Sequence, residues 1–420
     1  MKVLFLTNLY PPNVYGGYER LCYEVAQALQ ERGHDVTVLT SSYGKSCDEN
    51  YGHNVKRELF LFATEGNMYE PFNCAPEQRV EREASNRRVF EAVVEEVNPD
   101  VLFVWNLYFF NPGLLWLIEK SGIRKTYLLT DNWMIALLNA QFIGDYFSNK
   151  VFRSHGSQDR LIAAIRRFAR PIIRILTNKV FLMNGRAIFP SQFMRHLYRD
   201  AGFRFRDRDA ICYHGVHFLH SQDIKRISRL ELRSTSELRL LFAGRVVRIK
   251  GVHTAIEALN AIRARFVDIR VLLTIVGDTQ DSNYYNEIEQ LIDSLGVRDC
   301  IAFRPPVASE KLFDLFQEHD IYLFPSLYEP FSLTLIHALE SGIPTIASDA
   351  GGNVEIVEDG KTGLVFRAGD YDELAEKIYS LVVQPDLREN LSRMATALAA
   401  EFTFEGMISR IETELKKEAR

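Results

Sequence analysis

The sequence has no apolar run approaching the roughly 18 residues that a membrane span needs. Cysteine is scarce and forms no C-x-x-C pair; the five cysteines are Cys22, Cys47, Cys74, Cys212 and Cys300. This scatter argues against a disulfide framework and favours reduced thiols in a cytoplasmic protein. A basic excess is also absent, because the formal net charge is -5, which argues against nucleic acid as a partner.

The length and composition indicate two globular domains. The chain has 420 residues, of which 47% are hydrophobic and 25% charged, and one core rarely serves a chain of this length. The first apolar run is short and is followed by Pro11, Pro12, Gly16 and Gly17 instead of a small-residue cleavage site. We therefore interpret residues 3–7 as a buried strand and expect a cytoplasmic protein.

Short apolar strands alternate with helical patterns in both halves of the sequence. This alternation predicts an α/β fold with two Rossmann-like, doubly wound domains that face each other across a cleft. We expect residues 1–225 to form the acceptor-side domain and residues 226–401 to bind the donor. A helix at about 402–418 is expected to pack back on the first domain. Residues 44–95 and 132–158 fit no such pattern, which predicts long functional or disordered loops.

A glycine-bounded basic loop follows the predicted strand 238–243. It reads Gly244-Arg-Val-Val-Arg-Ile-Lys-Gly251. Glycine lets the backbone approach a ligand at the carboxyl end of a strand, and Arg245 and Lys250 supply two cations. The loop predicts a phosphate site, with a solvated basic loop as the alternative.

A second loop joins the predicted strand 321–324 to a helix. Ser332 fits the N-cap of that helix, so the amides of Leu333 and Thr334 would face an anion. Glu329 stands just before it, where a carboxylate would repel phosphate but could accept hydrogen bonds from sugar hydroxyls. The alternative is an acid favoured by the helix dipole. A third turn, Gly351-Gly352-Asn353, follows strand 345–348 at the same predicted edge.

These motifs resemble the retaining GT-B glycosyltransferases of family four. Gly244–Gly251 resembles the family's G-R-x-x-x-x-K-G loop, and residues 325–331 resemble its P-S-x-x-E-x-F motif. Residues 275–278 resemble its I-V-G-D turn, and residues 350–357 its G-G-x-x-E-x-V segment. The loop at 11–19 resembles its P-x-x-G-G-x-E motif, and His214 opens a segment that stands where the family has N-G-V-D. The six motifs run in order along nearly the whole chain.

The resemblance implies roles for named residues. Arg245 and Lys250 would hold the donor diphosphate, and Glu329 would bind hydroxyls of the transferred sugar. The remaining donor contacts would come from Gly16, Gly17, Gly244, Gly277, Arg304, Val307, Phe331, Ser332, Leu333, Thr334 and His337. The resemblance also implies a front-face reaction with retention of configuration, in which the departing phosphate takes the acceptor proton.

The chain departs from the family at two informative positions. His337 stands where the family has its second, ribose-binding glutamate, and an imidazole can still make one such hydrogen bond. Thr130-Asp131 stands where the family often has His-Asp, so the histidine credited with the reacting centre is missing. This leaves Asp131 as the catalytic candidate there. Asn106, Trp133 and His214 are further candidates for sugar or acceptor contacts.

We therefore expect a hexosyltransferase that moves glucose from a UDP-sugar to a glycan or lipid-linked acceptor, in envelope or extracellular polysaccharide synthesis. No cofactor is expected, and no metal, since Asp and His show no ligand spacing. Two alternatives stay open: a sugar-nucleotide epimerase of the same fold, and a nucleotide-binding protein without transferase activity. GDP donors and other hexoses also stay open, as does a monomer or a dimer.

One segment bears on location. Residues 160–179 are basic, with apolar residues at helical spacing, so they could lie peripherally on the inner face of a membrane. Packing on the first-domain sheet is the alternative, and Pro171 would interrupt a single long surface helix.

Overall fold

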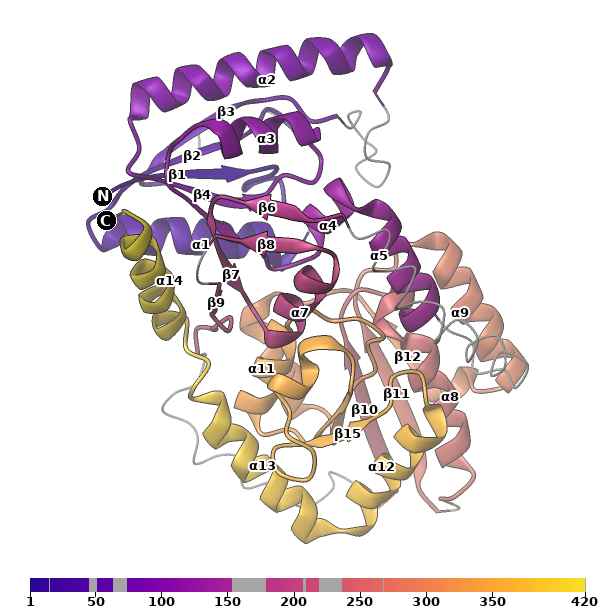
Figure 1. The fold of residues 1–420 in the computed structure, drawn as a ribbon. Helices are drawn as coiled ribbons and strands as arrows, with labels where there is room; N and C mark the ends of the chain where they lie inside the picture. Colours follow the sequence, from indigo (N-terminus) through magenta and orange to yellow (C-terminus); the bar gives the residue numbers. More distant parts are fainter. Residues whose placement is uncertain are drawn as a thin grey trace. The chain divides into compact units, whose positions relative to one another are not determined.

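The computed structural model describes residues 1–14, 16–44, 51–62, 74–152, 179–206, 209–218, 236–266 and 268–419. The chain divides into two compact units, Met1–Cys212 with Ile408–Arg420, and Tyr213–Met407. Each unit is a parallel sheet with helices, which confirms the predicted α/β class with two Rossmann-like units (Figure 1). The expected boundary at residues 225 and 226 lies outside the described residues.

The first unit is built on a seven-stranded sheet of order β3-β2-β1-β4-β5-β7-β9. Its strands are β1 (Lys2–Thr7), β2 (Asp35–Ser41), β3 (Asn54–Leu59), β4 (Val101–Asn106), β5 (Lys125–Leu128), β7 (Arg186–Phe189) and β9 (Ala210–Ile211). Every pairing is parallel; Val3, for example, stands between Val36 and Val101. A parallel sheet is covered on both faces, which is why β1, β4, β5 and β7 are almost wholly buried.

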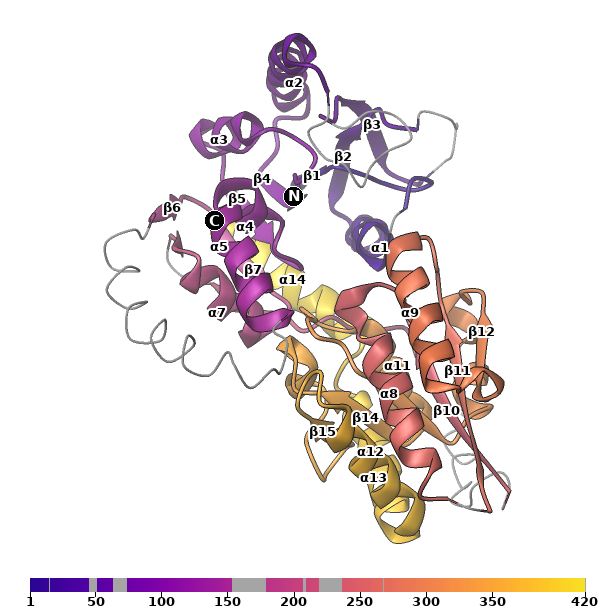
Figure 2. The same cartoon turned by 90° about the vertical axis from the view of Figure 1, so that its right-hand side faces the viewer.

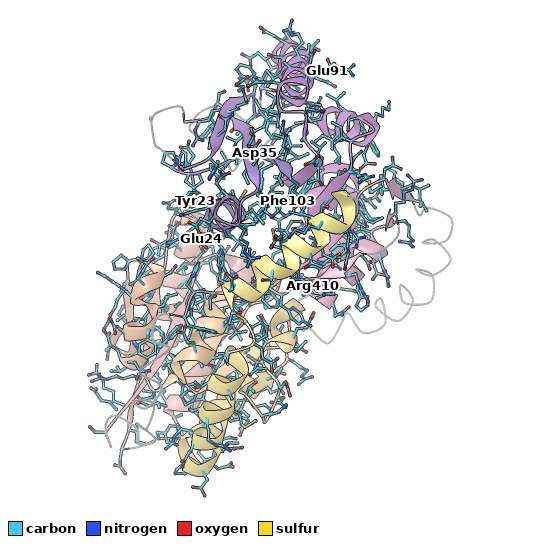
Figure 3. The ribbon with its side chains drawn as sticks, turned by 90° about the vertical axis from the view of Figure 1, so that its left-hand side faces the viewer. Tyr23, Glu24, Asp35, Glu91, Phe103 and Arg410 are labelled. Atoms are coloured by element: carbon cyan, nitrogen blue, oxygen red, sulfur yellow. The ribbon has the colours of Figure 1, made fainter. Side chains whose placement is uncertain are left out.

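Helices cover both faces of this sheet. They are α1 (Gly17–Glu31), α2 (Pro76–Val97), α3 (Pro112–Lys120), α4 (Trp133–Leu138), α5 (Ala140–Tyr146), α7 (Gln192–Asp200) and α14 (Phe404–Ala419), with a π-helical turn, η1 (Phe147–Val151). Figure 1 shows α2 and α3 on one side and α1 with α14 on the other. In Figure 3, Phe103 lies in the sheet between α2, marked by Glu91, and α14, marked by Arg410. A separate two-stranded sheet joins β6 (Phe181–Met183) to β8 (Phe203–Phe205).

The expectation of long loops at 44–95 and 132–158 was wrong for the described parts of both segments. The first contains β3 and the helix α2, and the second contains α4, α5 and η1. The pattern concealed α2 because its polar residues dominate: of 22 residues, Asn86, Phe90 and Val93 are buried. A helix with so narrow an apolar stripe gives little periodic signal.

The second unit is built on a six-stranded parallel sheet of order β12-β11-β10-β13-β14-β15. Its strands are β10 (Glu237–Ala243), β11 (Arg270–Val276), β12 (Ile301–Arg304), β13 (Ile321–Phe324), β14 (Thr345–Ser348) and β15 (Leu364–Phe366). Alternate residues of β10 enter two separate cores. Leu240 and Phe242 belong to one, and Leu241 and Ala243 belong to the other. This alternation of side chains fixes the register of β10 between the two cores, and with it the point at which the following loop begins.

Two layers of helices enclose that sheet. The helices are α8 (Val252–Arg263), α9 (Ser282–Leu295), α10 (Leu312–Gln317), α11 (Leu333–Ser341), α12 (Tyr371–Val383) and α13 (Pro385–Ala399), with short 3-10 turns η3 (Arg248–Lys250), η4 (Arg298–Cys300), η5 (Ser309–Lys311) and η6 (Gly351–Glu355). Figure 2 views the unit from the side on which α8 and α9 lie. Gly296 and Gly342 end α9 and α11 in the left-handed conformation, as their positions predict. The turn at Gly351 leads into η6 instead of an α-helix.

The last helix is held to the first unit by buried charge. Glu414 of α14 has a side chain that is 1% exposed, and its Oε2 lies 2.7 Å from Nη1 of Arg186 on β7. Glu412, two residues earlier, pairs with Arg32 and His34 just after α1. A buried carboxylate needs such partners because it has lost its hydration. The residues of α14 from Ile408 onward therefore belong to the first unit.

We predict that Glu414→Ala lowers the free energy of unfolding of the first unit by about 3 kcal/mol, because it leaves Arg186 buried without its carboxylate. Urea denaturation measures the change. Arg410→Ala is the control on the same helix, since Arg410 is half-exposed and stands 3.7 Å from Glu414. We expect that control to cost under about 0.5 kcal/mol. Equal effects of the two substitutions would contradict the role given to the buried pair.

Candidate active site

The strand order of the second unit defines where a ligand can enter. The chain runs outward from β10 through β11 to β12, then returns to the other side of β10 and runs outward through β13 to β15. The loops after β10 and β13 therefore leave the sheet edge in opposite directions. In open α/β sheets such a switch point opens a crevice at the carboxyl ends of the strands. Both predicted donor loops start there.

The loop after β10 touches the loop after β13 through backbone atoms. Gly251 has a φ of +70°, and a Cβ added there would lie 2.0 Å from the Pro325 carbonyl oxygen. The amide of Leu327 donates to the carbonyl of Ile249 at 2.7 Å. Only glycine allows both this φ and this approach. The predicted phosphate loop is thereby fixed beside the predicted sugar loop.

Two more glycines join the neighbouring loops. A Cβ at Gly277, after β11, would lie 1.8 Å from the Gly244 carbonyl oxygen. A Cβ at Gly351, after β14, would lie 2.0 Å from the Glu329 carbonyl oxygen. The amide of Gly352 also donates to that oxygen at 2.8 Å. The structure therefore brings the loops after four adjacent strands into contact, and these include the three turns that the sequence placed at one edge.

Lys250 and Glu329 form an ion pair at the centre of these loops. Nζ lies 2.5 Å from Oε2, and the side chains are 19% and 8% exposed. The carboxylate fixes the direction of the ammonium group, and the ammonium group offsets the cost of burying the carboxylate. Each group keeps hydrogen-bonding capacity for a ligand, because an ammonium has three donors and a carboxylate has two acceptor oxygens.

The other two cations of the basic loop differ from each other. Arg245 is exposed and makes no ion pair with the residues that the structure describes. Arg248 instead pairs with Glu287 of α9, and its guanidinium lies 5.5 Å from the ring centre of Tyr284. The Tyr284 hydroxyl is held in turn by Nδ1 of His253 at 2.7 Å. Arg245 and Lys250 are therefore the cations of this loop that can meet a ligand.

The N-terminus of α11 stands at the same edge. The Ser332 hydroxyl accepts a hydrogen bond from the Leu335 amide at 3.2 Å, which confirms Ser332 as the N-cap. The amides of Leu333 and Thr334 have no acceptor within the helix, because they belong to its first turn. They offer hydrogen bonds and the positive end of the helix dipole to an anion.

An aromatic stack supports that helix end. The ring of Phe331, just before the N-cap, stacks on Tyr213 with centroids 5.4 Å apart and meets His214 edge-on at 5.5 Å. His214 is 6% exposed, and its Nε2 has no hydrogen-bond partner among the described residues. Burial lowers the pKa of His214 to about 4, so the imidazole is neutral at pH 7. The structure places His214 against Phe331, the residue before the N-cap of α11. Tyr213, which sequence reasoning missed, carried no signal beyond its position next to His214.

His337 lies on the following turn of α11 with a partner that sequence reasoning missed. Nδ1 of His337 is 3.1 Å from Oε2 of Glu340, and both side chains are about 10% exposed. The spacing of three residues on a helix is the signal that could have revealed this pair. Glu340 fixes the orientation of the imidazole ring.

The two residues expected near the nucleotide base are more open. Arg304 ends β12, where its backbone carbonyl accepts from the Gly277 amide at 3.1 Å. Its guanidinium pairs with Glu318 at 2.8 Å, and both side chains are about half-exposed. Val307 is 37% exposed.

The first unit carries a polar cluster at its own switch point, between β1 and β4. Asp131 follows β5, and its Oδ1 accepts from the Trp133 amide at 2.8 Å. Its Oδ2 lies 3.5 Å from Nδ2 of Asn106, at the end of β4. Burial raises the pKa of Asp131 to about 6, with a smaller contribution from the nearby Glu19 carboxylate. A carboxyl group with this pKa changes charge near neutral pH.

The start of α1 contributes to the same cluster. Gly17 begins the helix, and the amide of Gly16 donates to Oε2 of Glu19 at 3.0 Å. Tyr18, absent from our sequence-based candidates, packs edge-on against Trp105 at 5.5 Å. Burial raises the pKa of Tyr18, and the Asp131 carboxylate raises it further, so the phenol stays protonated. The sequence signal that could have identified Tyr18 is its position within the G-G-Y-E motif at residues 16–19.

The indole of Trp133 is packed inside the first unit. Trp133 is 3% exposed, so its ring has no open face on which a sugar could stack. Its backbone amide reaches Asp131, as described above. Trp133 therefore contributes to the polar cluster through its backbone amide, which donates to Asp131.

Some classes of site are absent from the described part of the chain. No group of three or more His, Cys, Asp or Glu side chains there could hold a metal ion. None of its helices has the length and apolar character of a membrane span.

Comparison with protein families identifies the class of protein. Residues 15–218 match the family described as Glycosyltransferase Family 4, and residues 223–397 match Glycosyl transferases group 1. The two matches follow the two units of the fold and together span most of the chain. The chain therefore belongs to the family-four glycosyltransferases, with the GT-B fold.

Individual relatives are more distant. A D-inositol 3-phosphate glycosyltransferase of Paenarthrobacter aurescens is 31% identical over 39% of this chain and 40% of its own length. Mannosylfructose-phosphate synthase of Agrobacterium fabrum is 30% identical over 41% of this chain and 39% of its own length. The chain thus matches about two fifths of the length of these relatives. A D-inositol 3-phosphate glycosyltransferase of Streptomyces scabiei is 24% identical over 83% of this chain and 79% of the relative.

Solved structures share the whole fold at low identity. A sucrose-phosphate synthase from Thermosynechococcus elongatus has a TM-score of 0.70 and 18% identity, covering 99% of this chain and 98% of that chain. Anabaena HepE in complex with UDP-glucose has a TM-score of 0.65 and 20% identity, covering 99% of this chain and 100% of that chain. These likenesses show the fold.

We predict that Gly251→Ala disrupts the contact between the loops after β10 and β13, because its Cβ would collide with the Pro325 carbonyl. Gly360→Ala is the matched control, since Gly360 has a φ of +71° but open space around its Cβ position. The control should lose about 1 kcal/mol of unfolding free energy for the left-handed conformation alone. Gly251→Ala should lose clearly more in the same denaturant titration, and equal losses would contradict the contact.

We predict that Asp131 makes the stability of the first unit depend on pH. A carboxyl whose folded pKa is raised from 3.8 to about 6 favours folding when protonated, and this stability is lost as the pH rises through 6. Between pH 5 and pH 7 the loss should be about 1 kcal/mol. Asp131→Asn should remove that part of the pH dependence and unfold at higher denaturant at pH 7. Parallel pH profiles for the wild type and the variant would contradict the raised pKa.

Proposed function

We propose that this glycosyltransferase moves a hexose, with glucose as the first candidate, from a UDP-sugar to a hydroxyl group of a glycan or lipid-linked acceptor, with retention of configuration. The observation that carries the proposal is the Lys250–Glu329 ion pair beside the N-terminus of α11, at the switch point of the second sheet. Cations and free amides at one end of the site suit a diphosphate. The buried carboxylate of Glu329 suits the hydroxyls of a sugar.

The charges support a division of labour within the donor. Lys250, Arg245 and the first amides of α11 would bind the two phosphates, on which negative charge grows as the glycosidic bond breaks. Glu329 would accept hydrogen bonds from the hexose hydroxyls, and its own negative charge would keep the phosphates away from that end. The pairing with Lys250 makes this arrangement stable before the donor arrives.

The reaction would exchange one bond for another at the anomeric carbon. The bond from this carbon to the phosphate oxygen breaks, and a bond to the acceptor oxygen forms on the same face. The departing phosphate takes the acceptor proton, so the reaction needs no protein nucleophile. We assign Asp131 and Asn106 to the acceptor, because an Asp with a pKa of about 6 can accept a hydrogen bond from a hydroxyl near neutral pH.

The setting of the reaction is part of the same proposal. We expect it to need no metal ion, since two cationic side chains and a helix terminus can neutralise the diphosphate. We expect it to take place in the cytoplasm, as the free thiols of Cys22, Cys74 and Cys212 fit a reducing compartment. Synthesis of an envelope or extracellular polysaccharide is the role that we propose for the product.

We predict that Lys250→Ala lowers kcat for transfer from UDP-glucose by at least about a hundredfold, because it removes a cation that stabilises the leaving diphosphate. Arg248→Ala is the control in the same loop. The Arg248 guanidinium is already paired with Glu287, so this change should keep kcat within about threefold of wild type. Product formation is followed chromatographically, and the anomeric configuration is read by NMR.

Several outcomes would overturn the proposal. Turnover of Lys250→Ala within tenfold of wild type would remove Lys250 from the donor site. Conversion of UDP-glucose to an epimer without acceptor would favour an isomerase. Tight UDP binding by the wild type without transfer to any acceptor would favour a nucleotide-binding protein.

A further inference from the structure

The two-stranded sheet of β6 and β8 stands apart from the main sheet of the first unit. The strands are parallel and in register, with Phe181 opposite Phe203 and Leu182 opposite Arg204. Figure 2 shows β6 at the edge of the unit that lies away from β3. Side chains alternate between the two faces of a strand, so this pair has an inner face and an outer face.

The inner face is fully explained by packing. The rings of Phe181 and Phe203 stack with centroids 4.8 Å apart, and Phe203 is 1% exposed. Met183 is 2% exposed. The ring centroids of Phe205 and of Phe189 on β7 are 5.9 Å apart. This contact joins the two-stranded sheet to the main core. These contacts hold the two strands in place without any help from the opposite face.

The outer face exposes aliphatic side chains next to cations. We define it by Val180, Leu182 and Arg204, with Lys179 and Arg206 at its ends. Leu182 is 73% exposed and Val180 is 60% exposed, high values for large hydrophobic residues among those the structure describes. Single exposed aliphatic residues are ordinary, but Leu182 of β6 and Val180 just before this strand form, with three cations nearby, a patch of consistent character.

The cations of the outer face form no ion pair with the residues that the structure describes. Arg204 donates to the backbone carbonyls of Arg199 and Phe203, at 2.9 and 2.8 Å. Lys179 and Arg206 are exposed, and none of the three pairs with a carboxylate of the described residues. The nearby Asp209 is shared by Arg195 and Arg199 instead. The face therefore carries positive charge that is free to meet an anionic surface.

We propose that the outer face of β6 and β8 is a contact surface for an anionic lipid bilayer. Aliphatic side chains enter the headgroup boundary, while lysine and arginine at their sides meet the lipid phosphates. A protein partner is a poorer occupant, because a stable interface buries about 800 Å² on each side, far more than a face two short strands wide. Lysine and arginine also discourage pairing with another strand at this edge.

The chain leads to this face from residues 160–178, which lie outside the described residues. The proposal does not depend on them, since it rests on the exposure and charge of the residues from Lys179 onward. It is also independent of the proposed reaction, because membrane binding can be measured without a donor or an acceptor.

Flotation of the full-length protein with lipid vesicles tests the surface. We expect the wild type to float with vesicles of phosphatidylcholine containing about 30% phosphatidylserine, and not with pure phosphatidylcholine. Lys179→Glu with Arg206→Glu should weaken binding at least about tenfold, because each cation near an anionic surface contributes roughly fivefold. Leu182→Ser should weaken it by several-fold. Raising the salt concentration should release the wild type.

The helix α2 offers matched controls in the same unit. Val80 is 71% exposed, and Arg87 and Arg88, two turns further along α2, are exposed as well. Val80→Ser and Arg87→Glu with Arg88→Glu repeat the same changes in polarity and charge at a different place. Both should float like the wild type, and thermal unfolding should show all variants folded.

Four results would overturn the proposal. They are a wild type that does not float, equal losses for the α2 controls, unchanged binding of the Lys179 and Arg206 variant, and self-association through this face by sedimentation.

Discussion

Backbone atoms of neighbouring loops touch at the carboxyl edge of the second sheet, and the proposed donor site depends on these contacts. Gly251, Gly277 and Gly351 each stand where a Cβ would fall within about 2 Å of a carbonyl oxygen of another loop. Without a side chain at these points the loops after β10, β11, β13 and β14 come together. Lys250 can then reach Glu329 across 79 residues of sequence. The site is thus built from close packing of main chain, on which the charged side chains are placed.

Ion-pair partners decide where the charged side chains of these loops point. Arg248 and Lys250 differ by two positions in one loop, yet Arg248 turns to α9 and Lys250 turns to the crevice. The difference arises because Glu287 pairs with the guanidinium of Arg248, while Glu329 pairs with the ammonium group of Lys250. A carboxylate that would repel phosphate alone becomes part of the site through the cation that it holds.

The first unit has a different chemistry at its switch point. Its cluster contains Asp131, Asn106, Glu19 and Tyr18, and the pKa of Asp131 is raised there by burial and by the Glu19 carboxylate. Hydrogen-bonding groups without cations suit a hydroxyl group better than a phosphate. The difference matches the proposed division, in which the second unit binds an anionic donor and the first unit binds a neutral acceptor hydroxyl. The outer face of β6 and β8 adds exposed aliphatic side chains and positive charge elsewhere on the same unit.

Sequence alone determined the α/β class with two Rossmann-like units, the N-cap at Ser332 and the position of the glycine-bounded basic loop directly after β10. These features are local: apolar period, cap residues and glycines beside cations appear within a few positions. Tertiary structure decided the rest, because it depends on contacts between distant segments. It buried Trp133, turned Arg248 away, gave His337 its carboxylate partner and raised the pKa of Asp131. It also revealed α2, whose three buried residues left almost no trace in a polar sequence. Burial and ion pairing determine the pKa and the orientation of a side chain. Both depend on contacts with distant segments, so the adjacent residues in the sequence do not reveal them.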